Sequence, residues 1–168
     1  ARHPNLMYLG QDAHDLRLLL WGTAHPHVTD PDVPGHLRHP LYQSGRMNMF
    51  VDTWTWYDFL AQQDFAYGTR FHGNVAALLA GTPAMMLAHD SRTLELAEYH
   101  QMPHRIQHEF TEPIRAEDLY EATDLAPFNA AMPELFGRYT AFLDKNGLDH
   151  RWAAGNSGAE FDEQLAAA

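Results

Sequence analysis

The 168-residue sequence contains no cysteine, so it has neither a disulfide framework nor a thiol for catalysis. It also lacks an uninterrupted apolar run that is long enough to cross a bilayer, because Gly81, Thr82 and Pro83 break the longest one. Its N-terminal residues lack the apolar core of a signal peptide. These absences predict a soluble protein, and the lack of cysteine is typical of the cytoplasm, where we expect the chain to act.

Positive charge is also scarce, with 11 lysines and arginines against 22 aspartates and glutamates and a formal net charge of −11. A phosphate backbone would be repelled by such a chain, so we expect no nucleic-acid partner. A small anionic ligand is still compatible with this charge, because salt screens charges over about 10 Å and leaves a local arginine to act within its own pocket. The 45% apolar and 20% charged residues are typical of a folded domain rather than a disordered one.

Short apolar segments alternate with helical patterns along the first two-thirds of the chain. We expect strands at residues 6–9, 47–51, 65–69, 84–87 and 105–107. We expect helices between them at residues 12–21, 54–63, 74–80 and 91–101, the last beginning at Asp90 or Ser91 as N-cap. Strands separated by helices of this length form right-handed crossovers. The sequence therefore predicts an α/β fold with a Rossmann-like parallel sheet flanked by helices.

The pattern divides the chain into three parts: a Rossmann-like domain at 1–110, C-terminal helices at 111–150 that pack on it, and a frayed tail at 151–168. Residues 23–45 are dense in proline, histidine and glycine, which predicts a long surface loop. The C-terminal part contains a short helix near residues 116–122 and a strongly amphipathic helix over residues 129–145. The apolar face of the second helix predicts a possible homodimer.

Arg70 and His72 lie where the third strand turns into a helix. Ligands of parallel sheets bind at this edge, and the free N–H groups of a helix start favour anions. The planar fork of Arg70 fits a carboxylate or phosphate, and His72 is able to donate a proton near neutral pH. Gly68 and Gly73 leave room for close approach of the backbone. An equally weighted alternative is that Arg70 pairs with a nearby carboxylate and His72 satisfies a loop carbonyl.

The turn after the next strand repeats this arrangement with His89, a capping Ser91 and Arg92. A cation in the first helical turn opposes the helix dipole, so an anion is one reason for its presence. The alternative is a solvated arginine beside Glu95 and Glu98. Because adjacent loops are able to share one ligand, two such turns together favour the anion site.

Four histidines in the proline-rich loop, His25, His27, His36 and His39, lie near two aspartates and raise the possibility of zinc or nickel. Their spacing matches no familiar metal signature, and the prolines indicate an irregular path. We therefore expect no metal and no cofactor. The aromatic stretch over residues 50–59 is capable of stacking on a sugar through Trp54, Trp56 and Tyr57, although core packing is the favoured interpretation.

The segment from about residue 47 to 106 resembles the C-terminal part of the polysaccharide pyruvyl transferase family. The resemblance is carried by Asp64, by the run Gly68-Thr69-Arg70-Phe71-His72-Gly73, by Gly81-Thr82-Pro83 and by the basic turn Asp90-Ser91-Arg92. Members of this family transfer a pyruvyl unit from phosphoenolpyruvate to two sugar hydroxyls and leave a pyruvate ketal. They resemble two-domain GT-B glycosyltransferases whose C-terminal half holds the donor.

The resemblance implies roles for individual residues. Arg70 matches the arginine that grips the anionic groups of the donor, and His72 matches the histidine assigned as general acid. Phe71 and Gly73 would contribute backbone to the donor site, and Ser91 and Arg92 would contribute from the next turn. The implied partners are phosphoenolpyruvate and a sugar or lipid-linked oligosaccharide acceptor, in the synthesis of exopolysaccharide or cell-surface glycan.

Members of the family also have an N-terminal domain that helps to form the acceptor cleft, and we expect that domain to be absent from this chain. The isolated part would then bind the donor yet transfer little or nothing. Two other functions stay open from the sequence. One is the donor-binding half of a GT-B nucleotide-sugar glycosyltransferase, and the other is a non-catalytic binding module.

Overall fold

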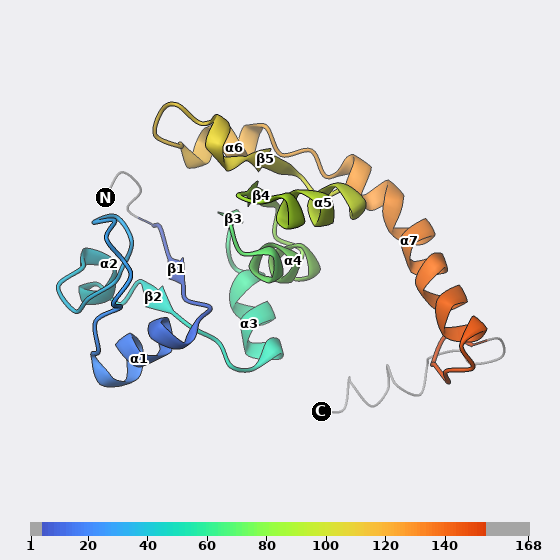
Figure 1. Ribbon diagram of the computed structural model, residues 1–168, viewed down its shortest axis with the longest axis horizontal. Helices are drawn as coiled ribbons and strands as arrows, with labels where there is room; N and C mark the ends of the chain where they lie inside the picture. The colour runs from blue at the N-terminus through green and yellow to red at the C-terminus, as the bar shows by residue number, and fades with distance from the viewer. Residues whose placement is uncertain (1–4, 154–168) are drawn as a thin grey trace.

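The computed structural model describes residues 5–153 and is an α/β structure with long C-terminal helices (Figure 1). Its five strands are β1 (Tyr8–Leu9), β2 (Met47–Asn48), β3 (Ala66–Gly68), β4 (Ala84–Ala88) and β5 (His104–Ile106). Its helices are α1 (Ala13–Trp21), α2 (Pro40–Gln43), α3 (Thr53–Leu60), α4 (Phe71–Leu79), α5 (Ser91–Tyr99), the 3-10 turn η1 (Gln107–Glu109), α6 (Ala116–Glu121) and α7 (Ala126–Lys145).

All strand pairs in the described residues are parallel, as the alternation of strands and helices predicts. Strands β3, β4 and β5 form one sheet in that order, and β1 pairs with β2 in a second sheet of two short strands. The α/β fold with parallel sheets flanked by helices is therefore confirmed. The strands do not form one continuous sheet, because no hydrogen-bonded ladder joins β1 to β3 among residues 5–153.

The core is centred on β4, in which all five residues are buried. Met85 and Leu87 pack on one face of the sheet with Leu119 of α6. Met86 packs on the opposite face with Ala97 of α5. Because side chains alternate along a strand, this division shows helices on both faces of the sheet.

Aspartates begin three of the helices that follow a strand. Asp12 and Asp90 form capping boxes at the starts of α1 and α5, and Asp52 accepts the N–H of Thr55 at the start of α3. Of the two residues that the sequence offers as N-cap of α5, Asp90 and Ser91, the structure uses Asp90. This capping fixes the direction in which each chain segment leaves its strand.

Helix α4 begins three residues earlier than the sequence pattern predicts, at Phe71 instead of residue 74. Phe71 and Val75, one helical turn apart, both pack against the core cluster that contains Met86. This packing extends the helix toward the strand. His72 and Gly73 therefore belong to the first turn of α4, and Arg70 is its N-cap.

The proline-rich loop is also more ordered than predicted, because α2 forms within residues 23–45. Pro40 occupies the first helical turn, where its missing N–H costs nothing. The buried His39 caps this helix by accepting the N–H of Leu41 at 3.2 Å through Nδ1. One of the four loop histidines thus has a structural role.

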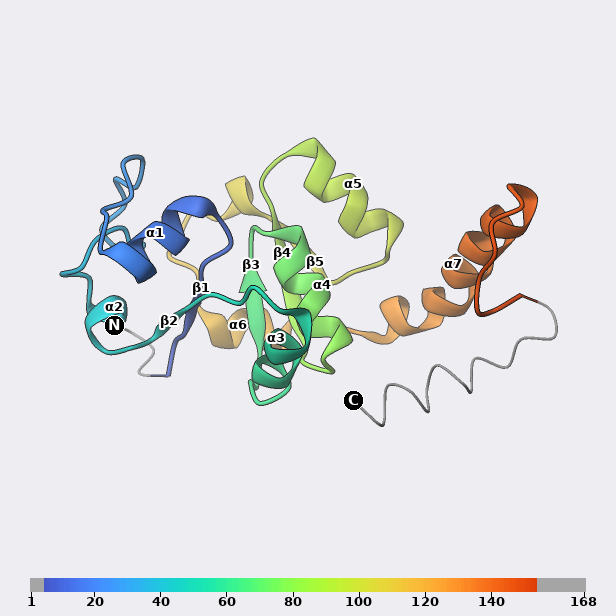
Figure 2. The same cartoon turned by 90° about the horizontal axis from the view of Figure 1, so that it is seen from below.

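The C-terminal helices meet the sheet at few points. Leu119 of α6 and Phe128 near the start of α7 pack on the core, and the remainder of α7 extends away from the sheet (Figures 1 and 2). Most of the predicted frayed tail, residues 154–168, lies outside the described residues. Within the described part of the chain, no helix is both long and apolar enough to cross a membrane.

Candidate functional site

The turn from β3 into α4 holds Arg70 and His72 at the carboxyl end of its strand. Both side chains are exposed at the surface, and the side chain of Arg70 is 61% exposed. Among residues 5–153, no side chain caps α4, in contrast to the aspartate caps of α1, α3 and α5. The first N–H groups of α4 are therefore open to an anion beside a permanent cation.

Asn74 holds this turn in place and was not singled out from the sequence. The residue is 3% exposed, and its side-chain amide donates to the carbonyl oxygens of Gly68 at 3.0 Å and Arg70 at 2.9 Å. The same amide nitrogen lies 3.3 Å from the sulfur of Met86 on the neighbouring strand. A buried amide with these partners ties the end of β3 to the first turn of α4, so it fixes the backbone from which Arg70 projects.

Asp12 faces Arg70 across the site, with its Oδ2 3.3 Å from Nη2 of the arginine. Its Oδ1 accepts the N–H groups of His14 at 2.8 Å and Asp15 at 3.0 Å. Burial raises the pKa of Asp12, but these N–H groups and the charges of His25 and Arg70 outweigh it and leave the pKa below its ordinary value. Asp12 is thus a fixed negative charge, and Arg70 does pair with a carboxylate as the alternative interpretation predicts.

Gln11 makes a second contact between the same two turns. A Cβ atom at Gly73 would come within 2.5 Å of Nε2 of Gln11, so the glutamine side chain lies directly against the first turn of α4. The turn after β1 and the turn after β3 therefore meet, although their strands belong to separate ladders. The sequence places Asp12 directly after a strand, as it does Arg70, but it does not show that these two turns meet.

His72 lies in the first turn of α4, two residues beyond Arg70. Its ring stands edge-on to Phe71, with the two centroids 5.8 Å apart. Phe71 in turn contacts the ring of His100, at 6.0 Å between centroids. His72 thus rests against a partly buried aromatic ring while its own imidazole is exposed, which leaves it accessible to a bound molecule.

The turn after β4 places Ser91 and Arg92 in the first turn of α5, both exposed. β3 and β4 are neighbouring parallel strands, so this turn opens at the same edge of the sheet as Arg70. Hydrogen bonds from Thr93 lower the pKa of Asp90, with smaller contributions from the charges of His89 and Arg92. The N-cap of α5 is Asp90, whose side chain accepts the N–H of Thr93. The Ser91 hydroxyl is therefore not used as the cap of this helix.

Three histidines gather beside Asp12. The ring centroid of His14 is 4.5 Å from that of His25 and 5.7 Å from that of His27. His25 also places Nε2 3.7 Å from Oδ2 of Asp12. Within the described residues, no group of three or more His, Asp or Glu side chains is arranged to hold a metal ion.

Of the aromatic stretch at residues 50–59, Trp56 and Phe59 pack against the core cluster of α3 and α4. Trp54 departs from the favoured core interpretation because 57% of it is exposed. It stands edge-on to Tyr57, with the ring centroids 6.2 Å apart. The stretch is therefore divided between the core and the surface.

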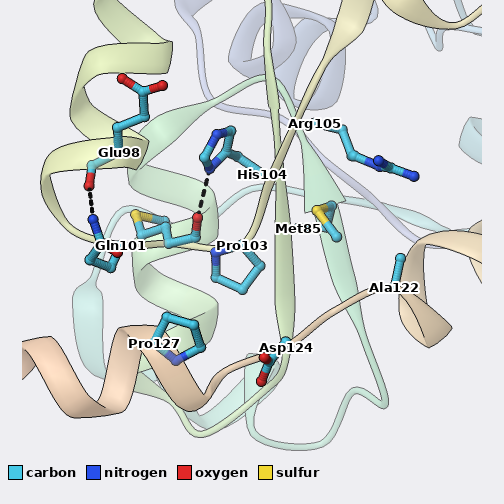
Figure 3. Close-up of a pocket in the computed structure, with 10 residues that line it drawn as sticks. Met85, Glu98, Gln101, Pro103, His104, Arg105, Ala122, Asp124 and Pro127 are labelled. Atoms are coloured by element: carbon cyan, nitrogen blue, oxygen red, sulfur yellow. Dashed lines mark hydrogen bonds between the residues drawn. The ribbon is translucent and has the colours of Figure 1, made fainter.

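A cavity of about 410 Å³ lies at the opposite edge of the sheet, near the amino ends of β4 and β5 (Figure 3). Its lining comes from the end of α5, the start of β5 and the link between α6 and α7, including Gln101, His104 and Asp124. None of the residues assigned above to the donor site lines it. The residues of the candidate donor site thus lie away from this hollow.

In a comparison with known protein families, residues 11–91 match a family model. This segment matches the polysaccharide pyruvyl transferase family. The match covers just under half of the chain and confirms the family resemblance, and it indicates a transferase. No curated protein and no solved structure matches the chain significantly.

The pyruvyl transferase segment begins earlier and ends earlier than the 47–106 range expected from the sequence. It includes Asp12 and the histidines beside it, as well as Arg70 and His72. It ends at residue 91, so Arg92 lies just beyond it. The turn after β1 therefore belongs to the same family segment as the turn after β3.

Proposed function

We propose that this chain is the donor-binding part of a polysaccharide pyruvyl transferase that moves a pyruvyl unit from phosphoenolpyruvate to two hydroxyls of a sugar. The observation that carries the proposal is the position of Arg70 and His72. Both lie within the matched family segment, exposed at the same open helix start at the carboxyl edge of the sheet. In this position a cation and a proton donor are able to act on one ligand.

Arg70 is available to an anionic donor although it pairs with Asp12. Exposed ion pairs contribute only about 0–1 kcal/mol to stability, so an incoming phosphate or carboxylate is able to replace this one at small cost. The anion would also gain the uncapped N–H groups in the first turn of α4. Ser91 and Arg92 would extend the site from the adjacent turn.

His72 would act as the general acid. Transfer of its proton to the methylene carbon of phosphoenolpyruvate turns that carbon into a methyl group and leaves cationic character on the central carbon. A sugar hydroxyl then bonds to the central carbon and loses its proton, and a second hydroxyl displaces the phosphate and loses its own. The products are the pyruvate ketal and inorganic phosphate, and a positioned acid contributes about 10²–10⁴ in rate.

The acceptor in this proposal is a sugar or a lipid-linked oligosaccharide in exopolysaccharide or cell-surface glycan synthesis. The reaction would take place in the cytoplasm, where phosphoenolpyruvate is available. The fold would correspond to the C-terminal half of a GT-B protein, which is consistent with the parallel sheets and flanking helices. The acceptor cleft would then require a further domain.

Thermal unfolding with different ligands tests the proposal. We expect phosphoenolpyruvate to raise the melting temperature in a dose-dependent way, and Arg70→Gln to abolish that rise. Arg105→Gln is the matched control, because this exposed arginine lines the cavity at the opposite edge. A larger rise with UDP- or GDP-sugars would favour a glycosyltransferase, and no rise with any anion would favour a non-catalytic module.

A further inference from the structure

The side chain of Asp12 is held by more hydrogen bonds than the side chain of Arg70. Asp12 is anchored through Oδ1 by two backbone N–H groups, and its own N–H donates to Asp15 at 3.3 Å. Arg70 reaches Asp12 with a single nitrogen, Nη2, and its side chain is 61% exposed. The carboxylate is therefore fixed to α1, whereas the long arginine side chain is free to swing toward another anion.

We propose that Asp12 is an internal competitor of the anionic ligand for Arg70. A phosphate or carboxylate at the start of α4 has to draw the guanidinium away from Asp12, and Asp12 also repels it as a like charge. The competition weakens the binding of both the phosphate-bearing donor and the phosphate product. This inference rests on the proposed function, since it assigns a role to Asp12 in the same donor site.

His25 makes the exchange feasible, because it leaves Asp12 with a partner when Arg70 moves. Its side chain is 12% exposed, and Nε2 lies 3.7 Å from Oδ2 of Asp12. Its Nδ1 accepts the backbone N–H of His27 at 3.2 Å, which orients the ring so that Nε2 faces the carboxylate. The backbone of His25 is in turn fixed by Gly35, whose carbonyl accepts its N–H at 2.7 Å.

A positioning role for Asp12 would have the opposite consequence. If the carboxylate oriented Arg70 for the ligand, its loss would weaken anion binding, as for any supporting contact. Competition instead predicts tighter binding when the negative charge is removed. The single-nitrogen contact and the exposure of Arg70 favour competition, because an orienting carboxylate normally grips the guanidinium through two parallel hydrogen bonds.

Asp12→Asn isolates the charge, because asparagine is as good an N-cap as aspartate and keeps the start of α1. The full chain and its variants are titrated calorimetrically with phosphoenolpyruvate and, separately, with inorganic phosphate. We expect Asp12→Asn to tighten both affinities about fivefold to tenfold, the size expected for one exposed ion pair together with one like charge. In an Arg70→Gln background the same change should have a much smaller effect.

Asp124→Asn is the matched control, because Asp124 also accepts a backbone N–H near a helix start, from Ala126 at 2.9 Å, but lies at the opposite edge of the sheet. It changes the net charge equally and should leave both affinities unchanged. If Asp12→Asn binds inorganic phosphate as weakly as the wild type or more weakly, Asp12 does not compete for Arg70. This holds whether the wild-type chain prefers phosphoenolpyruvate or inorganic phosphate. If the wild-type chain binds inorganic phosphate as tightly as phosphoenolpyruvate, the proposed donor is overturned instead. The phosphate titrations of Asp12→Asn would still decide whether Asp12 competes for Arg70.

Discussion

Gln11 lies against Gly73 so closely that a Cβ atom at residue 73 would come within 2.5 Å of the glutamine Nε2. In the same two turns, Asp12 Oδ2 lies 3.3 Å from Nη2 of Arg70. These contacts join the β1–α1 turn to the β3–α4 turn, which are far apart in the sequence and lie in separate ladders. The proposed donor site is therefore built from two turns, and each contact can be tested separately.

Alanine substitutions at Gly10 and Gly73 should have different effects on stability. A Cβ at Gly10 would come within 2.6 Å of Cβ of the buried Asp15, which cannot move without disturbing the start of α1. We expect Gly10→Ala to lower the free energy of unfolding by about 1–3 kcal/mol. Gly73→Ala should change it by less than about 1 kcal/mol, because the amide end of Gln11 is able to rotate away and alanine favours the helix. Urea unfolding measures both, and equal losses would contradict this account.

His72→Ala should abolish pyruvyl transfer while weakening donor affinity only modestly, because its main task is proton transfer and Arg70 supplies the permanent charge that holds the anion. Its exposed position in α4 predicts an unchanged melting temperature. Transfer is measured in a preparation that also supplies the acceptor-binding part, and donor affinity is measured by calorimetry. His36→Ala, at an exposed histidine of the proline-rich loop, is the control. Near-normal turnover by His72→Ala would refute its assignment as the acid.

Arg70→Lys should chiefly weaken donor binding, because lysine keeps the charge but loses the planar fork that pairs with a carboxylate or phosphate. We expect an affinity loss of about tenfold in a calorimetric titration with phosphoenolpyruvate, as for one lost charge-assisted hydrogen bond. Arg105→Lys at the opposite edge is the matched control. An unchanged affinity in Arg70→Lys would show that the fork is not used.

The strand and helix order could be predicted because buried apolar runs and helical spacing are local signals. Strand β4 is such a run, and all its residues are buried as predicted for a central strand. The sequence pattern predicts too late a start for α4, because Phe71 joins the helix through packing with residues distant in sequence. The turn of α2 was missed because proline and histidine at residues 39–40 are typical of loops but also suit a helix start.

The donor turn with Arg70 and His72 could be proposed from the sequence because strand ends and helix starts are visible there. The contribution of Asp12 could not, since its contact with Arg70 spans 58 residues and depends on how two ladders meet. Asn74 was missed for a related reason. Its position in an alanine-rich helix shows a polar residue but not the two carbonyl groups that it satisfies.

Gln101 occupies a left-handed backbone conformation, with φ at 53°, just after the end of α5. The N–H of Met102 donates to the carbonyl of Ala97 at 2.8 Å, which is the hydrogen bond of a Schellman motif at the end of the helix. Glycine is the usual residue at the left-handed position of this motif, which Gln101 occupies here. We expect Gln101→Gly to raise the free energy of unfolding by about 0.5–1 kcal/mol by relieving this conformation. Gln101→Ala keeps the strain and should give no gain, so a gain in both variants, measured by urea unfolding, would point to another cause.

Tyr8 should titrate far above an ordinary tyrosine. Burial first, and then the negative charges of Asp15 and Asp12 and a hydrogen bond with Asp15, raise its pKa from 10.0 to about 12. The neutral phenol is favoured in the folded protein, so its contribution to stability is complete below about pH 10 and is lost as the pH rises through about 12. The difference in phenolate absorbance between the wild type and Tyr8→Phe isolates this group among the seven tyrosines. A difference that titrates near pH 10 would show that Tyr8 is solvated and not enclosed beside Asp15.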